Sequence, residues 1–216
     1  MRSEWIPVSA SALITGAMAL VLAQMLNPMG SDSSPVRQLE IAADSPNRWL
    51  AMSILFFIAA VGLVLGMPSV MVLFTGRRGR ALGMLGVGVL TLGCMGVAGL
   101  SAMMLFFRSL ALEGALQAGE VKAVVEEPGM VVMLNVYVYG FLGGVLIVAA
   151  ALFRAKQTPV WVPILLVAFL AIQPLIPLAG PVLSAVGLMT LAAGFTGIAT
   201  AANTPARRAV VARSFA

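Results

Sequence analysis

A short polar cluster interrupts an otherwise apolar part of the sequence. Residues 131–144 read VVMLNVYVYGFLGG and contain Asn135 and both tyrosines of the chain, Tyr137 and Tyr139. Amide and phenol groups donate and accept hydrogen bonds without carrying charge. In a helix, Asn135 and Tyr139 share a face with Gly143, because residues four apart lie above one another, whereas Tyr137 points roughly 160–200° away. The spacing predicts a polar pair, Asn135 and Tyr139, and a separate tyrosine. The separate residue, Tyr137, fits the aromatic belt of a membrane interface.

The depth of the polar pair in a membrane determines what it needs. A helix over residues 129–153 is about 7 Å longer than a hydrocarbon core of roughly 30 Å, so Asn135 lies about 5–6 Å and Tyr139 about 11–12 Å below the outer boundary. Polar groups at that depth need hydrogen-bonding partners, and Gln24 and Gln173 are expected near the same boundary. We predict a ligand-binding group of Asn135, Tyr139, Gln173 and Gln24. Hydrogen bonds between helices, without a ligand, are the competing interpretation.

Missing residue types exclude most catalytic chemistry. The chain has no histidine, which excludes haem ligation through imidazole, Ser-His and Cys-His nucleophiles and His-containing zinc sites. Cys94 is the single cysteine, so no disulfide can form within the chain. We therefore predict no enzymatic activity, no metal and no cofactor. An enzyme would need a metal held by Glu120, Glu126 and Glu127, and capping of a helix that begins at Pro128 is the simpler role for the last two.

The composition predicts an all-α, polytopic membrane protein. Of the 216 residues, 61% are hydrophobic and 10% are charged, against roughly 45–50% and about 25% in soluble domains. Six apolar runs approach or exceed the roughly 20 residues that a transmembrane helix needs. They cover residues 8–26, 49–74, 81–107, 129–153, 160–178 and 181–202. We predict six transmembrane helices in one domain over residues 1–216, with outer loops at 27–48 and 108–128.

The distribution of charge predicts the orientation. With six spans, one side receives nine Lys and Arg and one acidic residue, and the other receives four Lys and Arg and seven acidic residues. Cytoplasmic loops carry the excess of Lys and Arg, so both termini, including the tail over residues 203–216, are expected in the cytoplasm. Eleven arginines against two lysines, with abundant Ala, Gly and Val, indicate a GC-rich genome and a bacterial plasma membrane. The scattered arginines form no stripe for nucleic acid, and the lipid bilayer is the expected partner.

Proline positions predict several boundaries. Ser or Thr caps the free amides of a helix and Pro fits its first position, which favours a short helix over residues 35–44. Residues 121–125 have the spacing of one amphipathic turn, and residues 204–215 alternate basic and apolar groups that suit the inner leaflet. Pro174 and Pro177 predict an irregular outer end of the fifth span, since prolines free carbonyl groups.

Glycine spacing places the helix over residues 81–107 at the centre of the bundle. Gly79, Gly86 and Gly93 recur every seven residues, and small residues let helices approach closely. Packing within one chain is the first interpretation. A membrane-protein partner or a homo-oligomer bound through this helix is the second.

Two resemblances carry further expectations. Residues 44–93, DSPNRWLAMSILFFIAAVGLVLGMPSVMVLFTGRRGRALGMLGVGVLTLG, resemble families of bacterial six-span proteins of unknown function, which implies topology and origin but no active residue. Residues 19–23, ALVLA, are similar to the alanine motif in the substrate-binding subunits of energy-coupling-factor vitamin transporters. That resemblance implies a pocket open to the outside and a transmembrane partner docked on the first helix.

We therefore predict a non-enzymatic integral membrane protein that acts as an accessory or scaffolding component through helix packing and extracytoplasmic loops. The alternative is a small-molecule binding or transport protein with an outward-facing pocket, similar to a vitamin-transporter subunit. A polar cavity open to the outside favours the alternative, whereas hydrogen bonds without a void favour the scaffold.

Overall fold

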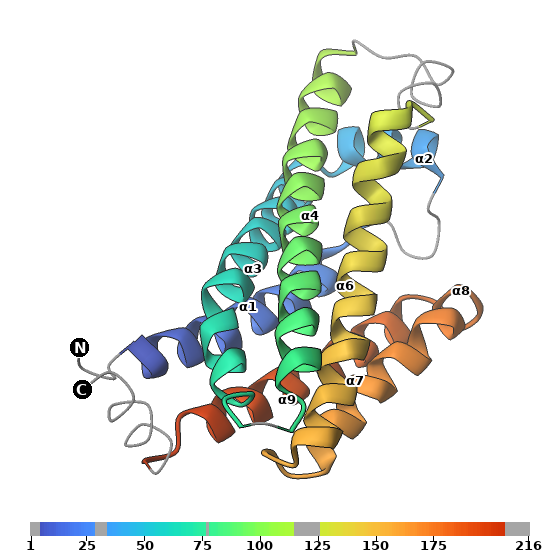
Figure 1. Cartoon of the computed structure of the whole chain (residues 1–216). Helices are drawn as coiled ribbons and strands as arrows, with labels where there is room; N and C mark the ends of the chain where they lie inside the picture. The colour runs from blue at the N-terminus through green and yellow to red at the C-terminus, as the bar shows by residue number, and fades with distance from the viewer. Residues whose placement is uncertain (1–4, 29–33, 77, 115–125, 206–216) are drawn as a thin grey trace.

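The structure is a computed structural model that describes residues 5–28, 34–76, 78–114 and 126–205. Helices form all the regular secondary structure in these ranges, as Figure 1 shows. The elements are α1 (Trp5–Leu26), α2 (Pro35–Asp44), α3 (Pro46–Val72), α4 (Arg80–Glu113), α6 (Pro128–Ala155), α7 (Trp161–Ile172), the 3-10 turn η1 (Gln173–Leu175), α8 (Ile176–Ala179) and α9 (Pro181–Ala202). The predicted all-α class is confirmed for the described residues.

Five of these helices, α1, α3, α4, α6 and α9, are long and apolar enough to cross a membrane. The sixth apolar segment is a broken helix, because α7 ends at Ile172 and the short elements η1 and α8 follow. Pro174 and Pro177 account for the break, since each lacks an N–H and its ring collides with the preceding turn. The expected irregular outer end of this segment is confirmed, and the span expected over residues 160–178 consists of three short elements.

Two other boundaries test the sequence predictions. The short helix α2 has the bounds expected for it, and Ser34 caps it by accepting a hydrogen bond from the Arg37 backbone N–H at 3.3 Å. The third span was expected to end at residue 107, but α4 continues to Glu113. The amphipathic turn predicted at residues 121–125 and the tail from residue 206 onward lie outside the described residues.

The six apolar segments form a closed ring. Along the chain α1 packs on α3, α3 on α4, α4 on α6, α6 on α7 and α7 on α9, and α9 returns to α1. In Figure 1, α3, α4 and α6 stand side by side, while α1 and α9 cross the lower half of the view obliquely. Inward side chains of the ring make one core that includes Leu63, Leu90, Val148 and Phe195.

Glycines set the closest helix contacts in the ring. A Cβ atom added to Gly16 of α1 would lie 2.5 Å from the Leu63 nitrogen of α3, and one added to Gly140 of α6 would lie 3.0 Å from the Gly93 Cα of α4. Only a hydrogen atom fits at such positions. The glycine face of α4 is thus filled by α6 of the same chain, so a homo-oligomer through the helix over residues 81–107 has no free surface on that face.

A serine from α1 repairs a proline defect in α3. Pro68 lies inside α3 and interrupts its hydrogen bonds. The Ser9 hydroxyl donates to the Leu65 carbonyl at 2.9 Å and accepts from the Ser69 backbone N–H at 3.0 Å. Leu65 and Ser69 would ordinarily bond to each other along the helix, so Ser9 is inserted between them and joins α1 to α3.

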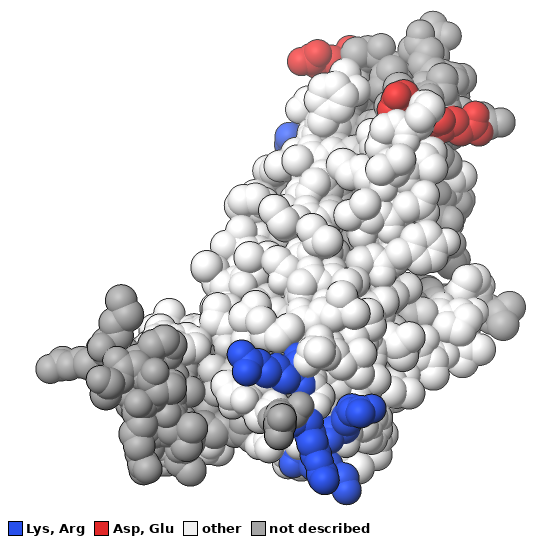
Figure 2. All heavy atoms as spheres, viewed as in Figure 1, with Lys and Arg blue, Asp and Glu red and all other residues white. Residues whose placement is uncertain are grey.

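Acidic side chains of the described residues gather at one end of the ring, which also carries Arg37, Arg48 and Arg108, and a group of Lys and Arg lies at the other end. Figure 2, viewed as Figure 1, shows Asp and Glu at the upper end and a group of Lys and Arg at the lower end. We call the acidic end the one that carries Glu113, Glu126 and Glu127, where α4 ends and α6 begins. The basic end carries Arg78, Arg80, Arg154 and Lys156, at the turns from α3 to α4 and from α6 to α7.

Candidate functional site

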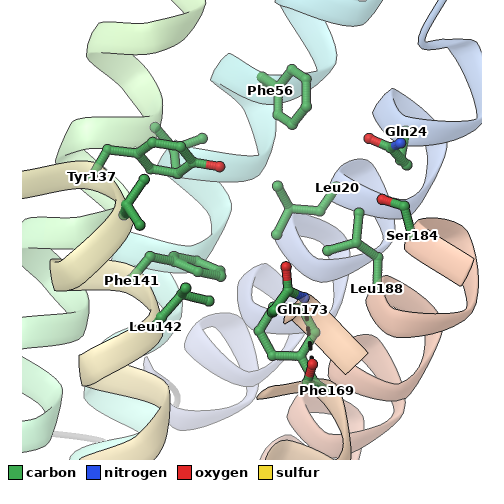
Figure 3. A pocket seen from close by; sticks show the side chains of 12 residues that line it. Leu20, Gln24, Phe56, Tyr137, Phe141, Leu142, Phe169, Gln173, Ser184 and Leu188 are labelled. Atoms are coloured by element: carbon green, nitrogen blue, oxygen red, sulfur yellow. Dashed lines mark hydrogen bonds between the residues drawn. The ribbon is translucent and has the colours of Figure 1, made fainter. Parts of the chain in front are cut away.

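A cavity of about 230 Å³ lies inside the ring, toward the acidic end, and every apolar segment contributes to its wall. Its lining residues are Leu20 and Gln24 of α1, Phe56 of α3, Val97 of α4, Tyr137, Val138, Phe141 and Leu142 of α6, Phe169 of α7, Gln173 of η1, and Ser184 and Leu188 of α9. Figure 3 shows these side chains surrounding the space. The cavity is therefore a product of ring closure and belongs to no single helix.

Four polar side chains project into this mainly apolar space. In Figure 3 the hydroxyls of Tyr137 and Ser184 and the side-chain carbonyl of Gln173 point toward its centre, with Gln24 above Ser184. Within the described part of the chain, neither hydroxyl makes a hydrogen bond. The two glutamines use one group each, because Asn27 donates to Gln24 Oε1 at 3.4 Å and Gln173 Nε2 donates to the Phe169 carbonyl at 3.4 Å. Donors and acceptors from α1, α6, η1 and α9 are thus available in one place.

Packing fixes the tyrosine and the floor of the cavity. A Cβ atom added to Gly96 of α4 would lie 2.7 Å from the Tyr137 Cα, so the glycine lets the tyrosine backbone sit directly against α4. One turn further along α6, Phe141 meets Phe169 of α7 edge to face, with ring centres 6.4 Å apart at an interplanar angle of 86°. Such aromatic pairs are worth about 0.5–1.5 kcal/mol beyond the area that they bury. This pair bridges α6 and α7 at the wall of the cavity.

The helix break positions the last polar group. Gln173 begins η1, directly before Pro174, where the segment changes from α to 3-10 geometry. A Cβ atom added to Gly187 of α9 would lie 3.8 Å from Gln173 Nε2 and 3.1 Å from Ile172 Cγ2. The break and the glycine together hold Gln173 at the cavity wall beside α9.

The described lining of the cavity carries no charge. Its lining contains no Lys, Arg, Asp or Glu among the described residues, and apart from the four polar groups it is aliphatic and aromatic. Since one water takes up about 30 Å³ of liquid, the volume equals that of roughly seven to eight waters. It is slightly smaller than the roughly 300–1,000 Å³ of most ligand pockets, which suits a molecule of one or two rings.

The structure divides the four residues that the sequence analysis grouped together. Gln24 and Gln173 both line the cavity. Asn135 and Tyr139 do not join them, because they lie on the opposite face of α6, in an open groove against α4. The tyrosine that does reach the cavity is Tyr137, which the sequence analysis assigned to the interfacial belt.

Sequence reasoning also missed Ser184, Phe141 and Phe169, for an identifiable reason. The helix α6 is apolar on every side, so its composition does not indicate which face points inward. The spacing of glycines did contain information about the inward face. This face of α6 carries Tyr137, Phe141 and Gly144 at i, i+4 and i+7, and it packs against the glycine face of α4. The inward face is the one that meets glycines.

The acidic residues considered for a metal have separate positions. The Glu127 side chain caps α6 by accepting from the Met130 backbone N–H at 3.1 Å, which confirms the expected capping role. Glu120 lies outside the described residues. Among the residues that are described, no group of three or more His, Cys, Asp or Glu side chains could hold a metal ion.

The alanine motif of the first helix faces inward. Ala19 is 4% exposed and Ala23 is fully buried, so neither presents a surface to a docked partner helix. Comparison with known proteins adds no relative: no protein family matches the chain, and no curated protein or solved structure is significantly similar to it. The two resemblances noted in the sequence therefore rest on the quoted residues alone.

Proposed function

We propose that this protein binds a small, neutral, planar molecule in the cavity inside its helix ring, without catalysing a reaction. The observation that carries the proposal is the convergence of Tyr137, Ser184, Gln24 and Gln173, from four elements, on one apolar space. Polar groups left unpaired in an apolar interior cost free energy, and a ligand that carries both a ring and an amide or hydroxyl group removes that cost.

The lining also supports selectivity. Phe56, Phe141 and Phe169 line the cavity, and aromatic rings can stack on a planar partner or meet it edge to face. A charged ligand would have to leave water for a space without a counter-ion, which is strongly unfavourable. The phenol of Tyr137 and the amide of Gln173 can together satisfy a carboxamide, which donates and accepts like an Asn side chain.

Membrane insertion and orientation are part of the proposal. We place six crossings, with α7, η1 and α8 together making the fifth, in a bacterial plasma membrane, with the acidic end outside and both termini cytoplasmic. The positive-inside rule supports this choice, because Arg78, Arg80, Arg154 and Lys156 share the basic end. In this orientation the cavity extends from the middle of α6, where Tyr137, Phe141 and Leu142 lie, toward the outer end of α1, where Gln24 lies.

The ligand proposal is tested with three probes that share a ring. Benzamide is neutral and planar with a polar group, toluene lacks the polar group, and benzoate is charged. Binding is measured by ligand-observed NMR on protein in lipid nanodiscs, with empty nanodiscs as the blank. We expect benzamide to bind more tightly than toluene and benzoate. Tyr137→Phe should weaken benzamide binding roughly 2- to 12-fold, the range for one lost hydrogen bond.

The chain offers a matched control for this experiment. Tyr139→Phe makes the same chemical change two residues away, on a face that does not touch the cavity. It should leave benzamide affinity unchanged, while Gln173→Leu should weaken it. Equal effects of Tyr137→Phe and Tyr139→Phe, or equal affinity for all three probes, would contradict binding in this cavity.

A scaffolding role is a second candidate, and the acidic end favours it. The 34 residues of α4 measure about 51 Å, about 21 Å more than the hydrocarbon core. This projection is held firmly: the Trp49 indole N–H donates to the Met104 carbonyl at 2.8 Å, and Arg108 Nε donates to the Pro46 carbonyl at 2.9 Å. A rigid extension suits contact with another protein outside the membrane.

Photo-crosslinking in intact membranes tests the scaffold. A photoreactive residue at Leu112, which is 52% exposed near the end of α4, should capture one defined protein. The same residue at Leu85, which is 57% exposed near the other end of the helix, is the control. Capture of the same protein from both positions, or from neither, would count against an outer scaffold.

A further inference from the structure

The face of α6 that points away from the ring carries the polar pair of the sequence motif. Val132, Asn135, Tyr139, Gly143 and Leu146 follow one another at helical spacing on this face. Tyr139 is 71% exposed, the largest exposure of any aromatic side chain in the described ranges. We call these five residues the outer stripe of α6.

The outer stripe lies at a depth where lipid cannot satisfy it. Along α6, Asn135 is about 12 Å and Tyr139 about 18 Å from Glu127, at 1.5 Å per residue. Glu127 and Lys156 flank the helix at its two ends, so Tyr139 is near the middle of the crossing. Neither the amide of Asn135 nor the phenol of Tyr139 has a hydrogen-bond partner within the described part of the chain. Hydrocarbon offers none, and unpaired polar groups there cost several kcal/mol.

The stripe borders a hollow that can receive a neighbouring helix. A groove of about 480 Å³ runs between α4 and α6 and is lined by Val89, Leu92, Val132, Asn135, Val136, Tyr139 and Gly140. Apart from the adjacent backbone of its own helix, no atom of the described residues lies within 4 Å of the position that a Cβ atom would take on Gly143 or on Gly88. Glycines with such open space beside them let another backbone approach closely.

We infer that two copies of this chain pair through the outer stripe, with Asn135 and Tyr139 of each copy hydrogen-bonded to those of the other. Symmetry favours a second copy of the chain as the partner of the outer stripe. Two copies inserted in the same orientation are related by a two-fold axis along the membrane normal, which places each residue opposite its own equivalent at the same depth. An amide both donates and accepts, so Asn135 complements itself. Any other partner would have to bring polar groups to the same depths independently.

This pairing differs from a seam through the glycine face of α4, which is filled within the chain. It rests on the proposed membrane crossing of α6 and not on ligand binding in the cavity. The two tyrosines separate the two proposals. Tyr137 belongs to the cavity and Tyr139 to the pair, so each substitution is the control for the other.

The test measures self-association in lipid vesicles at increasing lipid dilution, by energy transfer between fluorophores on separate copies. We expect the unchanged chain to form dimers. Asn135→Leu combined with Tyr139→Phe should raise the dissociation constant about tenfold or more, since up to four hydrogen bonds per dimer are removed at the modest value of each in membranes. Gly143→Leu, which fills the open space beside this glycine of the outer stripe, should also weaken pairing. Tyr137→Phe should have no effect.

Cysteine crosslinking gives a second measurement, which does not depend on the stability of the variants substituted at Asn135, Tyr139 or Gly143. In a Cys94→Ala background, Val136→Cys borders the groove, whereas Val138→Cys lines the cavity on another side of α6. Oxidation with copper-phenanthroline should crosslink two copies through position 136 and not through position 138. The inference is overturned if the unchanged chain stays monomeric at every lipid dilution, if the double substitution pairs as tightly as the unchanged chain, or if both cysteines crosslink equally.

Discussion

Uncharged polar side chains occupy three kinds of place in this membrane fold. Ser9 completes the backbone hydrogen bonds of another helix, Tyr137 faces an internal cavity, and Tyr139 faces outward. The environments differ although the side chains are equally neutral. The role of each polar residue therefore depends on whether its side chain faces a helix backbone, the cavity or the outside of the ring.

At the residue scale, Ser9→Ala tests the repair of the proline defect. It removes both hydrogen bonds of the hydroxyl, to Leu65 and from Ser69. We expect it to lower the free energy of unfolding by about 1–2 kcal/mol, measured by thermal or denaturant unfolding in mild detergent. Ser11→Ala is the control, because the Ser11 hydroxyl bonds only to the Pro7 carbonyl of its own helix and is exposed.

A double substitution makes the assignment specific. With Pro68→Ala, the backbone of α3 regains its own N–H and a regular turn. Ser9→Ala should then cost less than it does in the unchanged chain, which a double-mutant cycle measures. An equal cost in both backgrounds would show that Ser9 contributes only ordinary packing.

The candidate site was half predictable from these residues. Gln24 and Gln173 could be located because each is the single amide side chain within its apolar run, residues 8–26 and 160–178. The tyrosines could not be assigned, because their spacing shows that they face opposite ways but not which one faces the ring. That choice depends on glycines of α4, and these are distant in sequence.

At the element scale, the helices owe their close packing to selected glycines. Gly93 on α4 faces the backbone of α6 at Gly140 and Phe141, whereas nothing lies within 4 Å of a Cβ atom on Gly88 of the same helix. The two glycines are five residues apart and share the same helix. Their environments differ in whether another backbone is present.

Gly93→Ala and Gly88→Ala form a matched pair. The first should destabilise the protein by about 1–3 kcal/mol, because an added methyl forces α4 and α6 apart. The second should be neutral or stabilise by up to about 1 kcal/mol, because Ala is the better helix former. Unfolding of both variants under identical detergent conditions compares them, and similar losses of stability would contradict close backbone contact as the cause.

The existence of the long helices was predictable, but the full length of α4 was not. The apolar runs predicted the five long helices, and the Ser-Pro pattern predicted α2 at Pro35–Asp44. The extension of α4 to Glu113 escaped prediction because its last turns are held by polar contacts such as that of Arg108 with Pro46. Hydropathy does not record such contacts.

At the scale of the whole molecule, the ring has an acidic end and a basic end, which define its axis. The segments close from α9 to α1, and the acidic and basic ends lie at opposite ends of Figure 2. The proposed orientation sets the turn from α3 to α4 inside and the end of α4 outside. Cys94 is fully buried, so the unchanged chain provides a silent background for cysteine labelling.

Labelling with a membrane-impermeant maleimide measures this orientation. Glu113→Cys should react in intact cells, whereas Gly76→Cys, at an exposed position where nothing lies within 4 Å of the new side chain, should react only after the membrane is opened. The unchanged chain should not react under either condition. Reaction of Gly76→Cys in intact cells would reverse the proposed orientation.

The broken segment of α7, η1 and α8 also bears on how the ring is built during synthesis. Pro174 leaves the Leu170 carbonyl without its usual helical donor, so this segment is poorly suited to surround itself with lipid alone. It leaves the ribosome before α9, the helix that packs against all three of its parts. The last helix to be made is therefore the one that packs against the break, and we expect insertion of the proposed fifth crossing to be completed only after Pro181–Ala202 has followed it.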